Sequence, residues 1–180
     1  MTFPVFASGD VLNASDMNAV GLWLVKTQTI GTAVSSVTVT GAFSSDYENY
    51  RIIVNGGVGS NTTDGRLTLG STATGYYATS VYTAWGSNTV FGSAQSNAAF
   101  FAQSIRISPT SIDGWFDLRS PNLAKATGFS GQCVSMNTAD AGFVGVVGYL
   151  NDSTQYTAFT ITPSAGTMTG GTIRVYGYRN

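Results

Sequence analysis

The sequence predicts an all-β domain, a jelly-roll-like β-sandwich with an N-terminal extended arm and one short helix. Thr, Gly, Ser and Asn supply 24, 22, 20 and 11 of the 180 residues, whereas Glu occurs once and Lys twice. Strand and turn formers therefore abound, and strong helix formers are scarce. Beyond residue 28, short apolar alternations recur between turn residues, which is typical of a sandwich or barrel. We expect an anchoring arm and helix at 1–28 and the β domain at 29–180.

The first 28 residues have a different texture from the rest. Pro4 favours an extended arm, because proline disfavours helical geometry in the residue before it. A short helix is expected within Val11–Val25, where Met17, Val20 and Leu24 recur on one helical face. This face must pack either on the β domain or on another protein subunit. The candidate anchoring residues are Phe3, Phe6, Met17, Val20, Trp23 and Leu24.

About ten candidate strands follow, bounded by Gly, Ser, Asn, Asp or Pro. They are 37–39, 50–54, 66–69, 77–84, 100–107, 112–118, 128–136, 142–150, 157–161 and 173–177. The dipeptide Asn55-Gly56 predicts a hairpin or a turn after the second of these strands, and we expect a hairpin loop there. The chain shows no repeat of 20–50 residues, so a propeller or solenoid is not expected.

The ionisable residues exclude several classes of function. The 8 Lys and Arg against 9 Asp and Glu give a net charge of −1, so we expect no nucleic-acid partner. His is absent and Cys133 is the single cysteine, so catalytic triads, zinc sites and redox dithiols are not expected. No apolar run is long enough to span a bilayer, and no basic residue precedes Lys26. We therefore expect neither membrane insertion nor a signal peptide.

The remaining catalytic possibility is a polysaccharide hydrolase that uses carboxylates alone. Asp113 and Asp117 would share one face of a strand about 13 Å apart, which exceeds the roughly 5–9.5 Å that glycosidases use. Asp64, Asp140 and Asp152 lie in polar loops but lack the spacing of a dedicated calcium loop. The sequence therefore predicts no catalytic, cofactor-binding or metal-binding residue, and only distant Asp residues brought together by folding could form a hydrolase.

Four aromatic residues lie close together between Gly75 and Gly86. Aromatic rings can stack on the C–H face of a neutral sugar, although core or interface packing is the alternative. These candidate glycan-binding residues are Tyr76, Tyr77, Tyr82 and Trp85.

Several stretches resemble small virion proteins of tailed bacteriophages. The opening Phe6–Asn18 is similar to the short segment that begins many phage tail-fibre and minor structural proteins. Other stretches resemble a β-rich module found at the ends of such proteins. They are Tyr47–Gly56, Leu67–Thr72, Gly128–Gly131, Ser153–Ile161 and Gly170–Tyr178.

The resemblance implies a non-enzymatic virion structural protein without a cofactor, made in the host cytoplasm. Its N-terminal arm would bind other virion proteins, and the β domain would face outward as a homo-oligomer, expected to be a trimer, in a tail fibre or tail tip. A capsid decoration protein and a carbohydrate-binding module that recognises a host surface glycan are the alternatives. Only 17 charged residues, 8 basic plus 9 acidic, also favour an oligomer, because monomers rarely expose large neutral surfaces.

Overall fold

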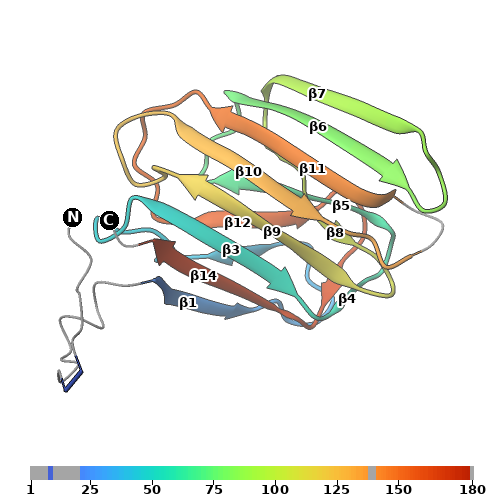
Figure 1. Cartoon of the computed structure of the whole chain (residues 1–180), viewed down its shortest axis with the longest axis horizontal. Helices are drawn as coiled ribbons and strands as arrows, with labels where there is room; N and C mark the ends of the chain where they lie inside the picture. Colours follow the sequence, from blue (N-terminus) through green and yellow to red (C-terminus); the bar gives the residue numbers. More distant parts are fainter. Residues whose placement is uncertain (1–7, 10–20, 138–140, 179–180) are drawn as a thin grey trace.

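The computed structural model describes residues 8–9, 21–137 and 141–178, and these residues form β-strands without any helix. The strands form two stacked layers (Figure 1). They are β1 (Leu22–Thr29), β2 (Val37–Val39), β3 (Asn49–Asn55), β4 (Val58–Gly59), β5 (Thr63–Leu69), β6 (Tyr76–Ala84), β7 (Val90–Ala98), β8 (Phe101–Ile107), β9 (Ile112–Arg119), β10 (Thr127–Cys133), β11 (Ala141–Leu150), β12 (Phe159–Pro163), β13 (Met168–Thr169) and β14 (Thr172–Tyr178). None of these residues forms a helix that could cross a membrane.

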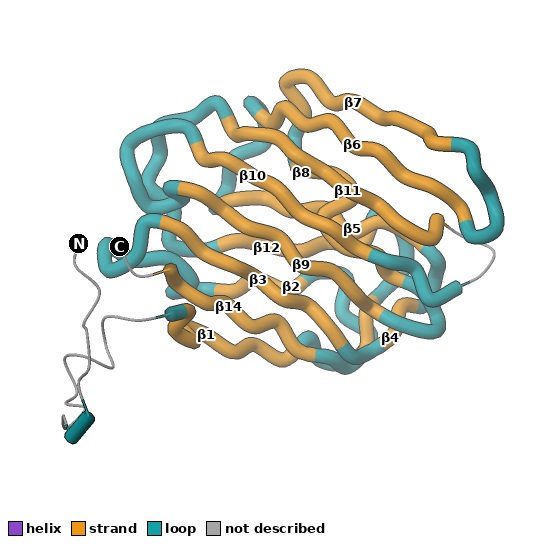
Figure 2. Tube along the Cα trace, in the orientation of Figure 1, coloured by secondary structure: helices purple, strands orange, loops and turns teal. Residues whose placement is uncertain are grey.

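The two layers differ in size. The large layer has the antiparallel order β1-β14-β3-β9-β10-β11-β6-β7, and the small layer has the order β2-β12-β5-β8 (Figure 2). They join where the end of β8 pairs with the start of β9, through Arg106–Asp113 and Ile107–Ile112. A separate pair, β4 with β13, lies off both layers in the pairing order. Eight strands therefore stand against four, so one layer cannot fully cover the other.

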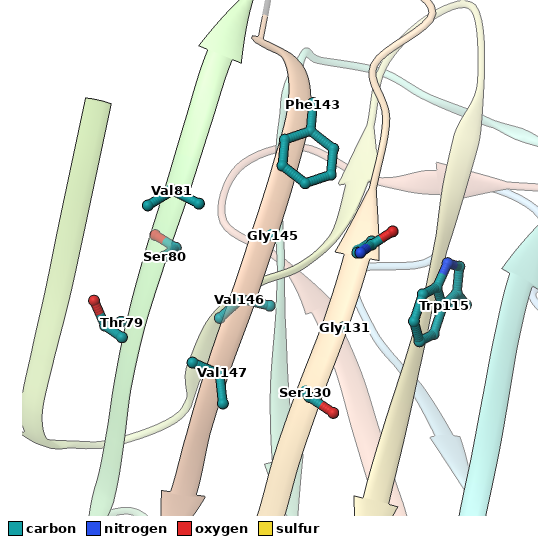
Figure 3. A pocket seen from close by; sticks show the side chains of 11 residues that line it. Thr79, Ser80, Val81, Trp115, Ser130, Gly131, Phe143, Gly145, Val146 and Val147 are labelled. Atoms are coloured by element: carbon teal, nitrogen blue, oxygen red, sulfur yellow. The ribbon is translucent and has the colours of Figure 1, made fainter. Parts of the chain in front are cut away.

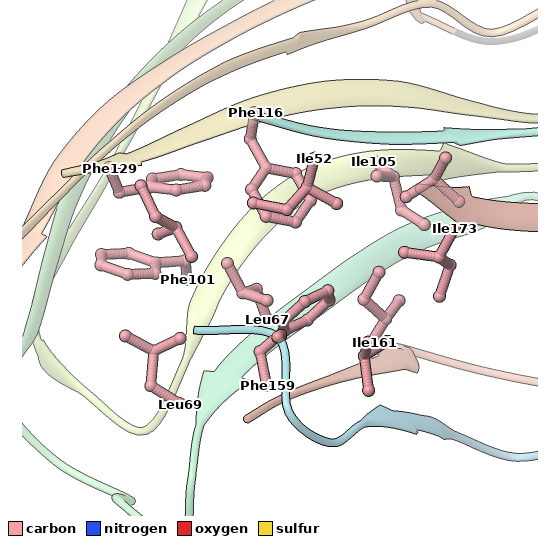
Figure 4. Packing of buried hydrophobic residues seen from close by; sticks show 14 of the residues in the cluster. Ile52, Leu67, Leu69, Phe101, Ile105, Phe116, Phe129, Phe159, Ile161 and Ile173 are labelled. Atoms are coloured by element: carbon pink, nitrogen blue, oxygen red, sulfur yellow. The ribbon is translucent and has the colours of Figure 1, made fainter. Parts of the chain in front are cut away.

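The core lies between the layers because alternate residues of each strand point inward. Strands β3, β5, β9 and β14 show strict alternation of buried and less buried residues. The rings of Phe101 on the small layer and Phe129 on the large layer stack with centroids 4.3 Å apart (Figure 4). Phe116 and Phe159 meet edge to face across the same gap at 6.2 Å.

The all-β prediction is confirmed, and each of the ten predicted strands overlaps a strand of the structure. The helix expected within Val11–Val25 is wrong at its C-terminal end, where β1 begins at Leu22; residues 11–20 lie outside the described part. Leu22 and Leu24 point to one face and Trp23 to the other, while β1 pairs along its length with β14. Sheet hydrogen bonds favour the strand here, since short isolated helices are marginal in water. The predicted boundary at residue 28 falls within β1.

The loop predicted as a hairpin after β3 is a turn that joins two different pairings. Gly56 and Gly57 both have positive φ, at 68° and 103°, as the sequence suggests. However, β3 pairs with β14 and β9, whereas β4 pairs with β13. The turn instead packs against Gly170 and Gly171, whose own φ values are 68° and 88°. The hairpin expectation is therefore wrong, because the strand that continues the sheet comes from the far end of the chain.

This close approach makes Gly171 a stability determinant. A Cβ at Gly171 would collide with the carbonyl group of Gly56, and an alanine at this position would also have to adopt a positive φ. We expect Gly171→Ala to destabilise the fold by more than about 2 kcal/mol in chemical denaturation. Gly86→Ala is the control, because Gly86 has φ 70° but open space around it, and its cost should stay near about 1 kcal/mol. Equal losses in the two variants would contradict the role of the close approach.

Candidate binding surface

The outer face of the large layer has a charged part over β3, β9 and β14. Arg51 lies directly across from Asp117 and donates two hydrogen bonds to its carboxylate, at 2.9 and 2.8 Å. Tyr178 donates a third, 3.1 Å long, and the Arg51 guanidinium lies 4.6 Å from the centroid of the Trp115 ring. The hydrogen bonds to Asp117 raise the pKa of Arg51. These charges satisfy one another, so this part of the face is a closed structural cluster.

The other part of the outer face belongs to β10, β11, β6 and β7, which contain no charged residue. We call these four strands the uncharged half. Its large apolar side chains are unusually exposed, from 41% for Phe143 to 65% for Val90. On the outer face the exposed set is Val81, Val90, Phe143, Val147 and Tyr149, whereas Phe91 is exposed on the opposite face beside Tyr82. Contiguous exposed apolar surface of this kind commonly marks a binding site.

Two adjoining hollows cross the uncharged half on its outer face. The first has a volume of about 390 Å³ and lies between Phe143 on β11 and Trp115 on β9 (Figure 3). Gly145 lines it without a side chain, and the Phe143 ring packs over this glycine. The second has a volume of about 360 Å³ and contains Tyr77 and Tyr149, whose rings stack at 5.2 Å. The two hollows share Thr79 and Val147, so they adjoin, and we call the two together the groove.

The chemistry of the groove is neutral and amphipathic. The polar side chains on its outer face are the hydroxyl groups of Thr79, Ser130, Tyr77 and Tyr149 and the amide of Gln132, and none of its lining residues is charged. Ser130 accepts a hydrogen bond from Arg119 at 2.9 Å, which positions its oxygen at the groove edge. Such a surface can stack on an apolar ligand face and exchange hydrogen bonds with hydroxyl groups.

The structure separates the four aromatic residues predicted to bind glycan. Tyr76 is fully buried, where its hydroxyl accepts from the Leu69 amide at 2.8 Å and burial raises its pKa to about 12. Tyr77 is on the outer face, whereas Tyr82 belongs to the opposite face of β6 and stacks on Phe91 at 5.4 Å. Trp85 lies beyond the end of β6, where it is half exposed and donates to the Ser135 carbonyl at 2.9 Å.

Of these four residues, the groove contains only Tyr77. The other aromatic residues of the groove, Tyr149, Phe143 and Trp115, were not predicted from the sequence. The alternation of Phe143, Val147 and Tyr149 with buried residues in β11 was the available signal, because alternate positions share a face.

The predicted anchoring residues are only partly described. Trp23 and Leu24 lie on β1, with Trp23 partly buried and Leu24 56% exposed on the opposite face. The indole Nε1 of Trp23 is buried without a hydrogen-bond partner among the described residues. Four others, Phe3, Phe6, Met17 and Val20, lie outside the described residues. Leu22, which precedes Trp23 on β1, is 45% exposed, so the start of this edge strand presents apolar surface.

The described acidic residues considered for catalysis or metal binding lie on different strands and loops, with Asp64 and Asp113 in register on either side of Arg106. Asp117 pairs with Arg51 rather than with its chain neighbour Arg119, and burial raises the pKa of Asp113. Asp64 pairs with Arg106, and Asp140 lies outside the described residues. Within the described part of the chain, no three His, Cys, Asp or Glu side chains gather in a way that could hold a metal.

Comparison of the chain with protein-family models finds no match, and neither does comparison with curated proteins.

Asp152 predicts a pH dependence of stability. Its carboxylate accepts hydrogen bonds from the Tyr156 hydroxyl at 2.6 Å and from the Thr154 amide and hydroxyl at 2.8 Å, which lower its pKa to about 2. Because the pKa of Asp152 is lower in the folded state than in the unfolded state, where it is about 3.9, the ionised carboxylate stabilises the fold at pH values above this unfolded-state pKa. This contribution is lost as the pH falls toward 2. We expect the wild-type melting temperature to fall more steeply between pH 4 and 2 than that of Asp152→Asn. Parallel curves for the two proteins would contradict this role.

Proposed function

We propose that this chain is a non-enzymatic structural protein of a phage virion. It is an outward-facing homo-oligomeric appendage, of the tail-fibre or tail-tip type, attached to other virion proteins through its N-terminal segment. The assignment to a virion rests on the resemblance of Phe6–Asn18 and of the β-rich stretches. A capsid decoration protein would use the same elements at another place in the particle.

The distribution of exposed apolar surface is the observation that best supports an assembly role. Such surface occurs at both edges of the large layer: Leu22 and Leu24 on β1, and the uncharged half at the other end. Surfaces of this kind in assembling proteins are covered by other chains, since each exposed large apolar side chain would gain about 1.5–3 kcal/mol on full burial. The position of β1 at an edge also suits an N-terminal attachment, because the strand directly follows residues 1–21.

We further infer that the sandwich is jelly-roll-like. The chain passes repeatedly between the layers: β1 and β3 lie in the large layer, and β2 and β5 lie in the small one. Such crossings between two antiparallel sheets are typical of Greek-key and jelly-roll folds.

Recognition of a neutral glycan is the second candidate function. The groove over the uncharged half supports it, because the stacked pair Tyr77 and Tyr149 stands beside the Thr79 hydroxyl, and no lining residue is charged. This arrangement suits a neutral polysaccharide of the host surface better than an acidic one.

Removal of residues 1–20 tests the attachment. We expect the shortened chain to keep β1 and to unfold at the same temperature as the full chain, but to be lost from particles. The measurement is the amount of this protein in purified particles made with the full or the shortened chain. Equal amounts of this protein in the two kinds of particle would contradict N-terminal attachment.

Substitution in the groove tests glycan recognition. We expect Tyr149→Ala to reduce binding to neutral oligosaccharides at least tenfold, with little dependence on salt because no ion pairs would be screened. The control is Tyr176→Ala, which removes a tyrosine from β14 at the charged part of the same face. Release of reducing sugar, measured in the same samples, would contradict the non-enzymatic assignment, and equal binding by both variants would exclude the groove.

A further inference from the structure

We propose that the free edge of β7 pairs antiparallel with β7 of a second copy of this chain, so that two large layers form one continuous sheet. The pairing deepens the proposed function by assigning the contact surface of the homo-oligomer. It predicts an even number of copies, in place of the trimer expected from the sequence.

The edges of the two layers differ in how they are protected. β1 contains Lys26 and a bulge between Leu24 and Lys26, and β2 is only three residues long. On the free side of β8, the Gln95 side chain of β7 accepts a hydrogen bond from the Ala102 amide at 2.8 Å. A charge, a bulge, a short length and a cover are the usual means by which edge strands avoid pairing with other chains.

Strand β7 lacks a charge and a cover, and its one register shift lies toward its C-terminal end, between the pairs Tyr76–Ala98 and Ala78–Gln95. It is nine residues long, it contains no charged residue and no Pro, and its register with β6 is continuous from Val90 to Gln95. No described strand lies on its other side. The backbone N–H and C=O groups on that side are therefore available to another strand.

The side chains of β7 also favour a strand partner. Val90 and Phe91 point to opposite faces of the sheet and are 65% and 45% exposed. On neighbouring β6, Val81 is 51% exposed on the outer face. The hairpin thus exposes large apolar side chains on both faces, and Figure 1 shows it at the end of the large layer. A strand added beside β7 would place side chains next to both faces at once.

The absence of charge favours a second copy as that strand. Two uncharged halves can meet without like-charge repulsion and without burying an unpaired charge. Gly92, Ser93 and Ala94, in the middle of β7, are small enough to let two backbones approach. An antiparallel pairing of β7 with itself is also two-fold symmetric, so a single contact closes the assembly.

The symmetry fixes which residues meet. A two-fold axis perpendicular to the sheet keeps outer faces together, so a residue opposes its own copy or a residue an even number of positions away. With the axis near the middle of the regular segment, Ser93 opposes Ser93 of the other copy or lies diagonal to it. Long side chains at this position would therefore interact across the axis.

Sedimentation velocity of the purified full chain tests the pairing. We expect wild type at about 38 kDa, twice the 18.8 kDa chain, or at an even multiple. Ser93→Lys should raise the Kd of this pairing at least tenfold, because two ammonium groups would face each other across the two-fold axis. Thr27→Lys is the matched control: it adds the same charge to an exposed residue of β1, the opposite edge strand, and should leave the mass unchanged.

A mixture of Ser93→Lys and Ser93→Glu chains separates charge repulsion from a folding defect. We expect the mixture to restore the wild-type mass, because opposite charges meet in the mixed pair. A monomeric wild type, a trimer of about 56 kDa, three times 18.8 kDa, or a Ser93→Lys variant of wild-type mass would overturn the proposal. So would a mixture that stays dissociated. Virion attachment through residues 1–20 is measured separately in particles and does not depend on these outcomes.

Discussion

The apolar contact between the two layers is the interaction on which the other features depend. Phe101 and Phe129 stack across the gap, and Phe116 meets Phe159 beside them. Rings in such contacts bury large areas and add about 0.5–1.5 kcal/mol per pair beyond burial. Because alternate residues of each strand face this contact, the remaining residues are directed to the outer faces, where packing does not restrict them. The binding surface is built from those outer positions.

The unequal size of the layers determines where the molecule is incomplete. Four strands cannot cover eight: the β6–β7 hairpin contacts β8 of the small layer through Ser80 and Gln95 but is left exposed around Val90 and Phe91. There Phe91 and Tyr82 stack on each other with Phe91 still 45% exposed, although both belong to the face that elsewhere forms the core. An isolated chain thus leaves apolar surface at that end, which a neighbouring molecule can cover.

Several of the few charged residues of the chain form ion pairs with one another. Arg51 with Asp117 and Lys125 with Glu48 each join residues that are distant in sequence. The second pair is exposed, and its contribution to stability is small. These pairs involve no residue of β6, β7, β10 or β11, and Arg119 reaches only β10, at Ser130, so the β6–β7 hairpin carries no charge of its own to repel a copy of itself. The same property suits a neutral glycan in the groove, and the two uses involve different parts of the uncharged half, the β7 edge and the outer face.

The sequence by itself determined the fold class and ten strands, because residues that alternate between core and surface leave a two-residue period. It did not predict β7, since Val90–Ala98 is exposed on both faces and has no such period. Tertiary structure decided the partners: Tyr77 meets Tyr149 only through the β6–β11 register, and Asp117 meets Arg51 rather than adjacent Arg119. Neighbours across a sheet come from strands far apart in the chain, and local patterns carry no information about which strands pair or in which register.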